Sequence, residues 1–185
     1  MDTKLLPEEL ETERLLLCRP QKEFAQAFYE YASGPTVGPL AGWSPHRSIK
    51  ESRQILQYFA KQGNVLSITL KEEGRMIGTV GLHKDEHRPG IDTWQLGYAL
   101  SPAYWHRGIA VEAAAAVVQY AFEQRLMPIL TAYCYPDNQP SRCLLEKLGF
   151  TYEGCLRNSY LRYDGTIHDQ ECFSLTFEEY VKNHR

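Results

Sequence analysis

The order of hydrophobic and polar positions predicts a chain that alternates strands with helices from its first segment. Residues 14–19 alternate between polar and apolar side chains and favour a strand. Residues 21–31 favour an amphipathic helix whose inward side chains are Phe24, Ala27, Phe28 and Tyr31. The chain therefore begins as a strand followed by a helix.

A long Gly- and Pro-rich segment follows, and a second helix follows that. Residues 33–47 hold three Gly and three Pro, which predicts a loop of the length that commonly binds or covers something. Ser48 is a suitable N-cap because Glu51 stands at capping-box spacing. The helix is expected over residues 49–61 and ends at Gly63.

The middle of the chain predicts a hairpin, an exposed loop and a further strand. Residues 65–70 and 75–83 favour two strands around a glycine-containing turn. Residues 85–90 are expected to form a charged, exposed loop. Residues 129–135 favour an apolar strand.

A short helix is predicted after that strand. Asn138 or Gln139 lies near its N-cap, Pro140 near its first position, and Gly149 at its C-terminal stop. Its inward side chains are expected to be Cys143, Leu144, Leu145 and Leu148.

The chain is expected to end in a hairpin. Residues 152–163 and 167–175 flank Asp164-Gly165, a dipeptide typical of a tight hairpin turn. Residues 177–185 are expected to be a frayed tail. The order of elements implies an α/β protein with a mixed sheet and helices on both faces, and a ligand is expected at the carboxyl ends of adjacent parallel strands.

The most informative stretch runs from Trp94 to Phe122, WQLGYALSPAYWHRGIAVEAAAAVVQYAF. It predicts a strand, a glycine-containing turn and a helix that begins after Gly108. The first N–H groups of a helix have no intrahelical partners and lie at the positive end of its dipole. Such a turn favours a phosphate or pyrophosphate, and His106 and Arg107 add donors or charge there.

Composition narrows the class of protein. A chain of 185 residues with 43% hydrophobic content suits one domain, and a net charge of −3 without a basic cluster argues against nucleic-acid binding. The acidic amino terminus lacks the apolar core of a signal peptide, and no run reaches membrane-spanning length. A cytoplasmic protein is expected.

Cysteine and histidine spacing argues against a metal site or a disulfide framework. The five cysteines are odd in number and form no C-x-x-C pair, and the histidines lack the H-x-x-x-H spacing of a helical metal site. We expect reduced thiols in or near the core, and no metal.

Four segments together resemble the GCN5-related N-acetyltransferases (GNAT), in particular the RimJ/RimL-like branch that acts on ribosomal-protein N-termini. They are ETERLLLCRP, IGTVGL, LGYALSPAYWHRGIAVEA and NQPSRCLLEKLGF, in this order and at these spacings. The resemblance implies one domain over residues 12–182, with a three-layer α/β/α fold and a mostly antiparallel mixed sheet that is splayed at the cofactor site.

The resemblance also implies where acetyl-CoA would bind. Pantetheine is expected along the strand near Ala99 and Leu100, and the pyrophosphate on the amides of Trp105, His106, Arg107, Gly108, Ile109 and Ala110. Trp105 replaces the Gln or Arg usual in the family motif, and His106 stands where Gly is common and is expected to hinder close backbone approach. Binding through amides tolerates both changes, because the N–H donors do not depend on the side chain.

Catalytic roles follow from the same resemblance. Asn138 matches a residue that hydrogen-bonds pantetheine, and Ser141 one placed near the departing thiolate. Ser141 is the first choice for the proton donor, with Tyr152 or Tyr160 in reserve. Both Asn138 and Ser141 are also types favoured at helix starts, so a capping role stays open beside the catalytic one.

The general base is not identified by the sequence. Many relatives carry a carboxylate at the position of Gln95, which cannot take a proton. Asp92, Glu171 or a water chain are alternatives, and so is an amine that arrives neutral. A ping-pong route through Cys143 or Cys134 is a weaker alternative, because a thiol in an apolar element is more often core.

The predicted function is a direct acetyl transfer from acetyl-CoA to a primary amine in a ternary complex, with a protein N-terminus as the leading acceptor. Trp43, Trp94 and Gln95 are candidate acceptor-binding residues, although a loop Trp is as often a packing anchor. The alternatives are a small-amine acetyltransferase acting on polyamines, aminoglycosides or amino-acid derivatives, and a non-catalytic acyl-CoA-binding module. A homodimer is also considered.

Overall fold

The computed structural model describes residues 4–184, and these form two compact units. The N-terminal unit comprises the described residues up to Leu82 together with Tyr98–Val117, and the C-terminal unit comprises His83–Gly97 and the described residues from Val118 onward. Residues 1–3, which open the acidic amino-terminal segment, and Arg185, which ends the predicted tail, lie outside the described residues.

The N-terminal unit carries a run of antiparallel strands, β1 (Glu9–Glu11), β2 (Leu15–Cys18), β3 (Val65–Leu70) and β4 (Arg75–Lys84), whose last two residues pass into the other unit. In the β2–β3 register Leu15 lies opposite Leu70 and Leu17 opposite Ile68, which buries both pairs. The sequence pattern predicted β2, β3 and β4. It missed β1, because two glutamates in three residues hide the strand.

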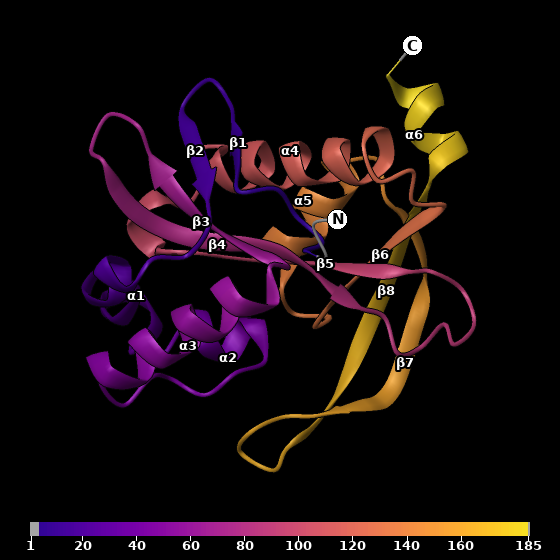
Figure 1. The fold of residues 1–185 in the computed structure, drawn as a ribbon. Coiled ribbons are helices and arrows are strands. Elements are labelled where there is room, and N and C mark those ends of the chain that lie inside the picture. The colour runs from indigo at the N-terminus through magenta and orange to yellow at the C-terminus, as the bar shows by residue number, and fades with distance from the viewer. Residues whose placement is uncertain (1–3, 185) are drawn as a thin grey trace. The chain divides into compact units, whose positions relative to one another are not determined.

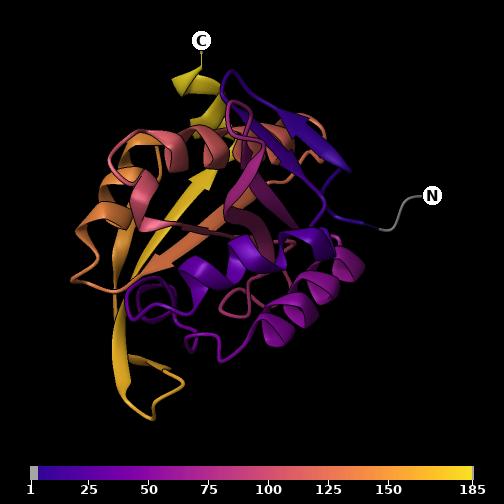
Figure 2. The same cartoon turned by 90° about the vertical axis from the view of Figure 1, so that its left-hand side faces the viewer.

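Three helices of the same unit pack together, α1 (Ala25–Ala32), α2 (Val37–Ala41) and α3 (Ile49–Gln62) (Figure 1 and Figure 2). A short 3₁₀ turn, η1 (Lys22–Phe24), precedes α1. Buried side chains from all three helices and from β4 form one cluster, which consists of Ala25, Phe28, Tyr31, Ala32, Val37, Leu56 and Met76.

The loop predicted over residues 33–47 is wrong in part, because α2 forms inside it. Pro39 stands in the first turn of α2, where a missing N–H costs nothing. Gly38 allows the chain to fold back, since a Cβ there would lie 2.7 Å from the carbonyl oxygen of Trp43. Gly42 then ends the helix in the left-handed region.

The ends of α3 are those that the sequence predicts. The Ser48 hydroxyl accepts a hydrogen bond from the Glu51 N–H at 3.2 Å, and Gly63 takes the left-handed conformation after the last turn. The Glu51 carboxylate accepts from the Arg47 N–H instead of returning to Ser48, so the capping box is only half formed.

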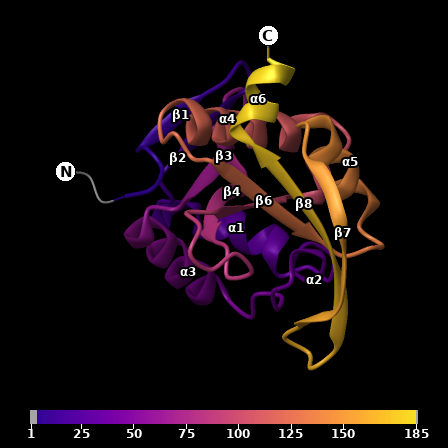
Figure 3. The ribbon, with the colours of Figure 1, turned by 90° about the vertical axis from the view of Figure 1, so that its right-hand side faces the viewer.

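In the C-terminal unit the strand order is β5 (Trp94–Leu100), whose last three residues belong to the N-terminal unit, then β6 (Ile129–Cys134), β8 (Ile167–Thr176) and β7 (Thr151–Leu161). Figure 3 shows β6, β8 and β7. The β5–β6 pair is parallel, and β6–β8 and β7–β8 are antiparallel. The predicted tight turn at Asp164-Gly165 forms within the five residues between β7 and β8. The Gly165 N–H donates to the Arg162 carbonyl at 3.0 Å, the Arg162 N–H donates to the Thr166 carbonyl at 2.9 Å, and Gly165 has a φ of 83°.

The remaining helices are α4 (Ile109–Glu123), which the two units share, α5 (Gln139–Lys147) and α6 (Phe177–Asn183). The predicted frayed tail is wrong, because α6 begins with a full capping box between Thr176 and Glu179. Tyr180 anchors this helix: its ring stacks on Phe122 at 4.8 Å, and its hydroxyl donates to Glu123 at 2.7 Å.

These elements confirm the predicted mixed α/β class, with eight strands and six α-helices among residues 4–184. The described residues include no helix long and apolar enough to cross a membrane, and no group of three metal-ligating side chains placed to hold an ion. Organisation as one domain over residues 12–182 stays a prediction.

Candidate functional site

The predicted anion turn lies in the N-terminal unit between β5 and α4. After Leu100 the chain forms a 3₁₀ turn, η2 (Pro102–Tyr104), and α4 begins at Ile109. Two residues of the connection have positive φ, 60° at His106 and 74° at Gly108. His106 thus takes the backbone conformation that glycine would supply, which costs about 1 kcal/mol for an L-residue. The structure shows His106 as an exposed residue with a strained backbone.

The Trp105 N–H donates to the Pro102 carbonyl at 3.2 Å, so the first amide predicted to bind the pyrophosphate already has a partner. The later amide groups of this turn are available to a ligand. The first backbone hydrogen bond of α4 runs from the Glu112 N–H to the Gly108 carbonyl at 3.0 Å, so the helix does not use the N–H groups that precede Glu112. A Cβ at Gly108 would meet only Arg14 Nη2, at 3.6 Å, so the backbone there is open to close approach. Such a turn can bind a phosphate.

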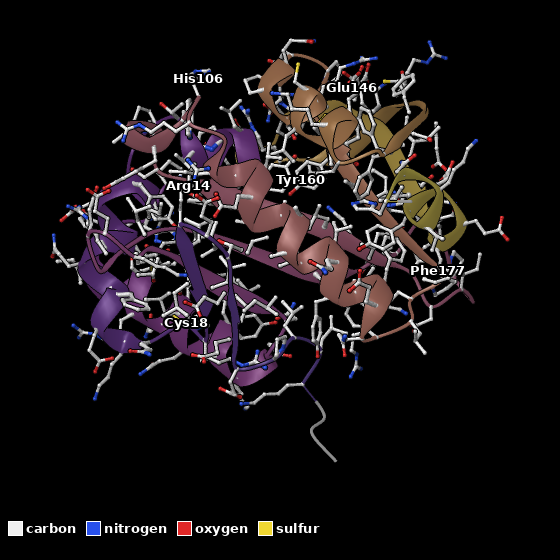
Figure 4. The ribbon with its side chains drawn as sticks, turned by 90° about the horizontal axis from the view of Figure 1, so that it is seen from above. Arg14, Cys18, His106, Glu146, Tyr160 and Phe177 are labelled. Carbon is white, nitrogen blue, oxygen red and sulfur yellow. The ribbon has the colours of Figure 1, made fainter. Side chains whose placement is uncertain are left out.

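Arg14 on the strand side holds this turn in place (Figure 4). Its Nη1 donates to the Arg107 carbonyl at 2.9 Å, and its Nε donates to Glu112 Oε2 at 2.6 Å. The Arg14 N–H and the Thr12 hydroxyl both donate to Glu112 Oε1, at 2.9 and 2.6 Å. Burial raises the pKa of Glu112, but these bonds outweigh it and hold the pKa below its ordinary value. No sequence signal pairs Glu112 with Arg14.

Trp105 anchors the turn from inside. Its indole Nε1 donates to the Leu100 carbonyl at 2.8 Å, and its ring packs against the helical cluster together with Ala99. The carbonyl of Leu100, which was expected to pair with pantetheine, therefore already has a partner within the protein. This contact gives Trp105 a structural role at the turn.

The charged groups around the turn are partly neutralised. The Arg107 guanidinium lies 5.5 Å from the centre of the Tyr104 ring, and the Tyr104 hydroxyl donates to Glu73. This hydrogen bond raises the pKa of Tyr104. A cavity of about 350 Å³ is lined by the residues of η2 together with Tyr31 and Arg75 among others, and none of the predicted site residues lines it.

Asn138 and Ser141 lie at the start of α5 in the C-terminal unit. Asn138 is the N-cap, because its Oδ1 accepts from the Ser141 N–H at 3.2 Å. The capping interpretation of Asn138 is therefore confirmed, and its side-chain NH₂ is the group left to bind a ligand. The Ser141 side chain hydrogen-bonds the Cys134 thiol. Both residues are half-buried.

The five cysteines differ in their exposure to solvent. Cys143 was predicted to face inward, but it is exposed, as is Cys155, because the apolar face of α5 is formed by Leu144 and Leu145. Burial raises the pKa of Cys134 to about 11, with the nearby Glu171 charge adding to it. A thiol that stays protonated is a poor nucleophile, which disfavours the ping-pong route through Cys134.

Gln95 marks the end of the parallel ladder. Within the described residues the β5–β6 register pairs Trp94 with Leu130 and Gln95 with Thr131 and goes no further. Gln95 is half-buried. Trp94 has partners of its own, since its Nε1 donates to Asp92 at 3.1 Å and the Lys84 ammonium lies 5.2 Å from its ring.

The other acceptor-pocket candidate, Trp43, is a packing residue of the N-terminal unit. It is partly buried against the helical cluster, and its ring lies 5.1 Å from that of His46. His46 in turn is buried and its Nδ1 lies 2.8 Å from the Ser52 hydroxyl. The Trp43 side chain therefore stabilises the region around α2.

The alternative acid and base residues mostly have partners too. Glu171 is buried and accepts from Arg142 Nη1 at 2.7 Å, and Arg142 also lies over the Tyr152 ring at 4.9 Å. Asp92 is exposed and paired with Lys84 at 3.2 Å. The ring of Tyr160 lies 6.0 Å from that of Tyr135. These contacts give structural roles to the residues that were predicted as alternative acids and bases.

Asp85, which was predicted to be exposed, is buried. The prediction is wrong because the Asp85 carboxylate accepts hydrogen bonds from two side chains of β6 that are 46 and 48 positions away in sequence. The charged residues of a loop give no sequence signal that one of them will be buried.

Comparison with known proteins decides the family. A family model described as an acetyltransferase (GNAT) domain matches residues 14–151, which include the turn before α4 and the start of α5. The chain belongs to the GNAT acetyltransferase family. It is therefore an N-acetyltransferase, and hence an acyltransferase.

Relatives of this N-acetyltransferase support the assignment. The uncharacterized N-acetyltransferase p20 of Bacillus licheniformis is 33% identical over 94% of this chain and 99% of its own length. The [ribosomal protein uS5]-alanine N-acetyltransferase of Escherichia coli is 27% identical, with 69% of this chain and 66% of that protein covered.

Solved structures show the same fold as this N-acetyltransferase. A GNAT-family acetyltransferase from Bacillus anthracis has a TM-score of 0.82 at 24% identity and covers 92% of this chain and 99% of its own. The microcin C7 self-immunity acetyltransferase MccE, solved with acetyl-CoA and AMP, has a TM-score of 0.78 at 21% identity and covers 95% and 99%.

Proposed function

We propose that this N-acetyltransferase transfers the acetyl group of acetyl-CoA to the α-amino group of a protein N-terminus. The observation that carries the cofactor part is the turn before α4, where Gly108 leaves the backbone open and the N–H groups before Glu112 are unused by the helix. The acetyl-CoA in MccE and the ribosomal-protein acceptor named for the Escherichia coli relative support the two halves of the proposal.

In this proposal the pyrophosphate binds the amides of residues 106–110, where backbone donors and the helix dipole both favour an anion. Arg107 adds a positive charge, and Arg14 keeps the turn in its open form through the Arg107 carbonyl. Pantetheine extends past Ala99 and the strand end at Leu100, and the Asn138 side-chain NH₂ donates to it. Acetyl-CoA supplies the activated thioester.

Ser141 is proposed as the proton donor to the departing thiolate. Its hydroxyl contacts the Cys134 thiol and acts to lower the pKa of that thiol, as a donor to a thiolate does. A hydroxyl that donates to the leaving sulfur lowers the barrier to C–S cleavage, and a proton donor of this kind contributes about 10²–10⁴-fold to rate. Tyr152 and Tyr160 stay as reserve donors.

Two other functions remain as alternatives. A small amine such as a polyamine, an aminoglycoside or an amino-acid derivative is a second acceptor class for GNAT chemistry. A non-catalytic acyl-CoA-binding module is favoured by one observation, the neutral Gln95 at the position where relatives carry a base. We also propose a cytoplasmic location, since the five free cysteines suit a reducing compartment, and a homodimer.

Product mass separates these functions. The protein is incubated with acetyl-CoA and a mixture of N-terminal peptides, polyamines and aminoglycosides, and each class is searched for a gain of one acetyl group. We expect acetylated peptides. Acetylated small amines alone would replace the acceptor class, and acetyl-CoA binding without any acetylated product would support the non-catalytic module.

Ser141→Ala tests the assigned acid in the same assay. We expect kcat to fall about 10²–10⁴-fold while acetyl-CoA affinity changes little. Cys143→Ala is the matched control, because Cys143 is exposed on the same helix and we expect it to retain wild-type kcat. Unchanged turnover in Ser141→Ala would remove the acid role from this residue.

A further inference from the structure

A buried carboxylate lies on the face of the C-terminal sheet that carries Gln95. Gln95 and Thr131 are register partners in the parallel β5–β6 pair, and paired residues of neighbouring strands direct their side chains to the same face. The Thr131 hydroxyl donates to Asp85 Oδ2 at 2.9 Å. Asp85 therefore lies on the same face as Gln95, in contact with the register partner of Gln95.

All the hydrogen-bonding capacity of Asp85 is directed inward. Its side chain is 0% exposed, and Oδ2 accepts from the Tyr133 hydroxyl at 3.0 Å as well as from Thr131. Oδ1 accepts from the His87 N–H at 2.9 Å. Burial raises the pKa of Asp85, but these hydrogen bonds outweigh it and leave the pKa below its ordinary value. Asp85 stays ionised near neutral pH and is a poor proton acceptor itself.

His87 is the group that this carboxylate orients. Its Nδ1 lies 3.5 Å from Asp85 Oδ1, and its ring lies 4.9 Å from that of Tyr133. The side chain remains 43% exposed. An imidazole whose Nδ1 faces a carboxylate presents Nε2 as its proton acceptor, and the carboxylate stabilises the imidazolium that forms.

We propose that His87, oriented by Asp85, is the general base of the reaction. The proposal rests on the proposed acetyl transfer and assigns the role that Gln95 cannot fill. The amine nitrogen forms a bond to the thioester carbonyl carbon, and its proton passes to His87 Nε2. The C–S bond then breaks, and the CoA thiolate takes a proton either from Ser141, which regains one from solvent, or directly from water. His87 releases its proton to solvent.

The other charged groups near His87 form ion pairs with one another. Arg88 Nε lies 3.8 Å from Asp85, and the Arg88 guanidinium is paired with Glu153 of β7. Glu153 also accepts from the Ser174 hydroxyl of β8 at 2.8 Å. On β6 the hydrogen bond to Asp85, with burial, raises the pKa of Tyr133, which therefore stays neutral. Within this cluster the His87 ring is both exposed to solvent and adjacent to the buried carboxylate.

The test is the pH dependence of kcat for His87→Gln at saturating acetyl-CoA and amine, so that the free amine does not contribute. The wild type should lose kcat on the acid side, and His87→Gln should have kcat lowered about 10²–10⁴-fold and lack that acid limb. Acetyl-CoA affinity, measured by calorimetry, should not change. Added imidazole should restore part of the kcat of His87→Gly.

His184→Gln is the matched control, because His184 lies beyond α6 and its Nδ1 bonds the Tyr180 carbonyl. It should retain the wild-type profile. An unaltered kcat and acid limb in His87→Gln would overturn the proposal, and so would loss of the limb in Asp92→Asn or Glu171→Gln instead. Absence of turnover by the wild type would overturn the acetyl-transfer function as well, whereas wild-type turnover that survives in His87→Gln overturns only the role of His87.

Discussion

Arg14 and Glu112 form a two-point contact across the turn that precedes α4. The Arg14 Nε and its backbone N–H each donate to a different oxygen of the Glu112 carboxylate, at 2.6 and 2.9 Å. Because Arg14 Nη1 also donates to the Arg107 carbonyl, the pair ties the start of α4 to the strand region near β2. The position of the turn, and with it the proposed phosphate site, depends on this contact.

Removal of the arginine should weaken acetyl-CoA binding. In Arg14→Ala the Arg107 carbonyl and Glu112 lose their charged donor, and we expect Kd to rise roughly tenfold, about 1.4 kcal/mol. Calorimetric titration with acetyl-CoA measures it. Arg53→Ala removes an exposed arginine of α3 as a control. Equal affinities for the two variants would mean that Arg14 does not position the turn.

The same pair predicts a pH dependence of stability. The pKa of Glu112 is lowered in the folded protein, so its contribution is complete above the ordinary carboxyl pKa and is lost as the pH falls through the lowered value. The difference in free energy of unfolding between wild type and Glu112→Gln should therefore be largest near neutral pH and shrink below about pH 4. Urea unfolding from pH 3 to 7 measures it, and a constant difference would contradict the linkage.

Backbone strain in the turn gives a paired prediction. Gly108→Ala places an L-residue at a φ of 74°, which should destabilise the protein by about 1 kcal/mol and weaken acetyl-CoA binding. His106→Gly removes the strain at a φ of 60° and should retain binding.

Gly165→Ala is the control for strain alone. Gly165 has a φ of 83° in the β7–β8 loop with open space around it, so the variant should lose stability by a similar amount and bind acetyl-CoA normally. Thermal unfolding and calorimetry report the two effects. Equal affinities for Gly108→Ala and Gly165→Ala would argue against a ligand at the turn.

Capping and cofactor binding at Asn138 can be separated. Asn138→Asp keeps the oxygen that accepts from the Ser141 N–H but removes the NH₂ group. It should preserve Tm and weaken acetyl-CoA binding, whereas Asn138→Ala should also lose about 1 kcal/mol of stability. If Asn138→Asp binds acetyl-CoA as the wild type does, the residue is a cap only.

Thiol labelling tests the placement of the cysteines. Cys143 and Cys155 are exposed and should react rapidly with an aromatic disulfide reagent in the native protein. Burial raises the pKa of the other three thiols, Cys18, Cys134 and Cys172, which should react only on unfolding. Rapid native labelling of Cys134, located by mass spectrometry of peptides, would contradict the structure.

Local sequence signals predicted much of the fold correctly. The strand, turn and helix around Gly108, the N-cap at Ser48 and the N-cap at Asn138 depend on residues within a few positions of each other. The failures share a different cause. The segment that forms α6 was predicted to be a tail, because the contact that stabilises this helix is made with Phe122, which is distant in sequence. Only the N-terminal cap of α6 is local.

The sequence by itself determined where the turn between β5 and α4 forms, because Gly108 supplies the positive φ that the turn needs between a strand and an apolar helix. It also carried the motifs that resemble a GNAT protein. Only the tertiary structure decided that Arg14 holds that turn and that Asp85 is buried beside Gln95. Both depend on strand register and on hydrogen bonds between residues 46 or more positions apart, and chain proximity carries no information about such partners.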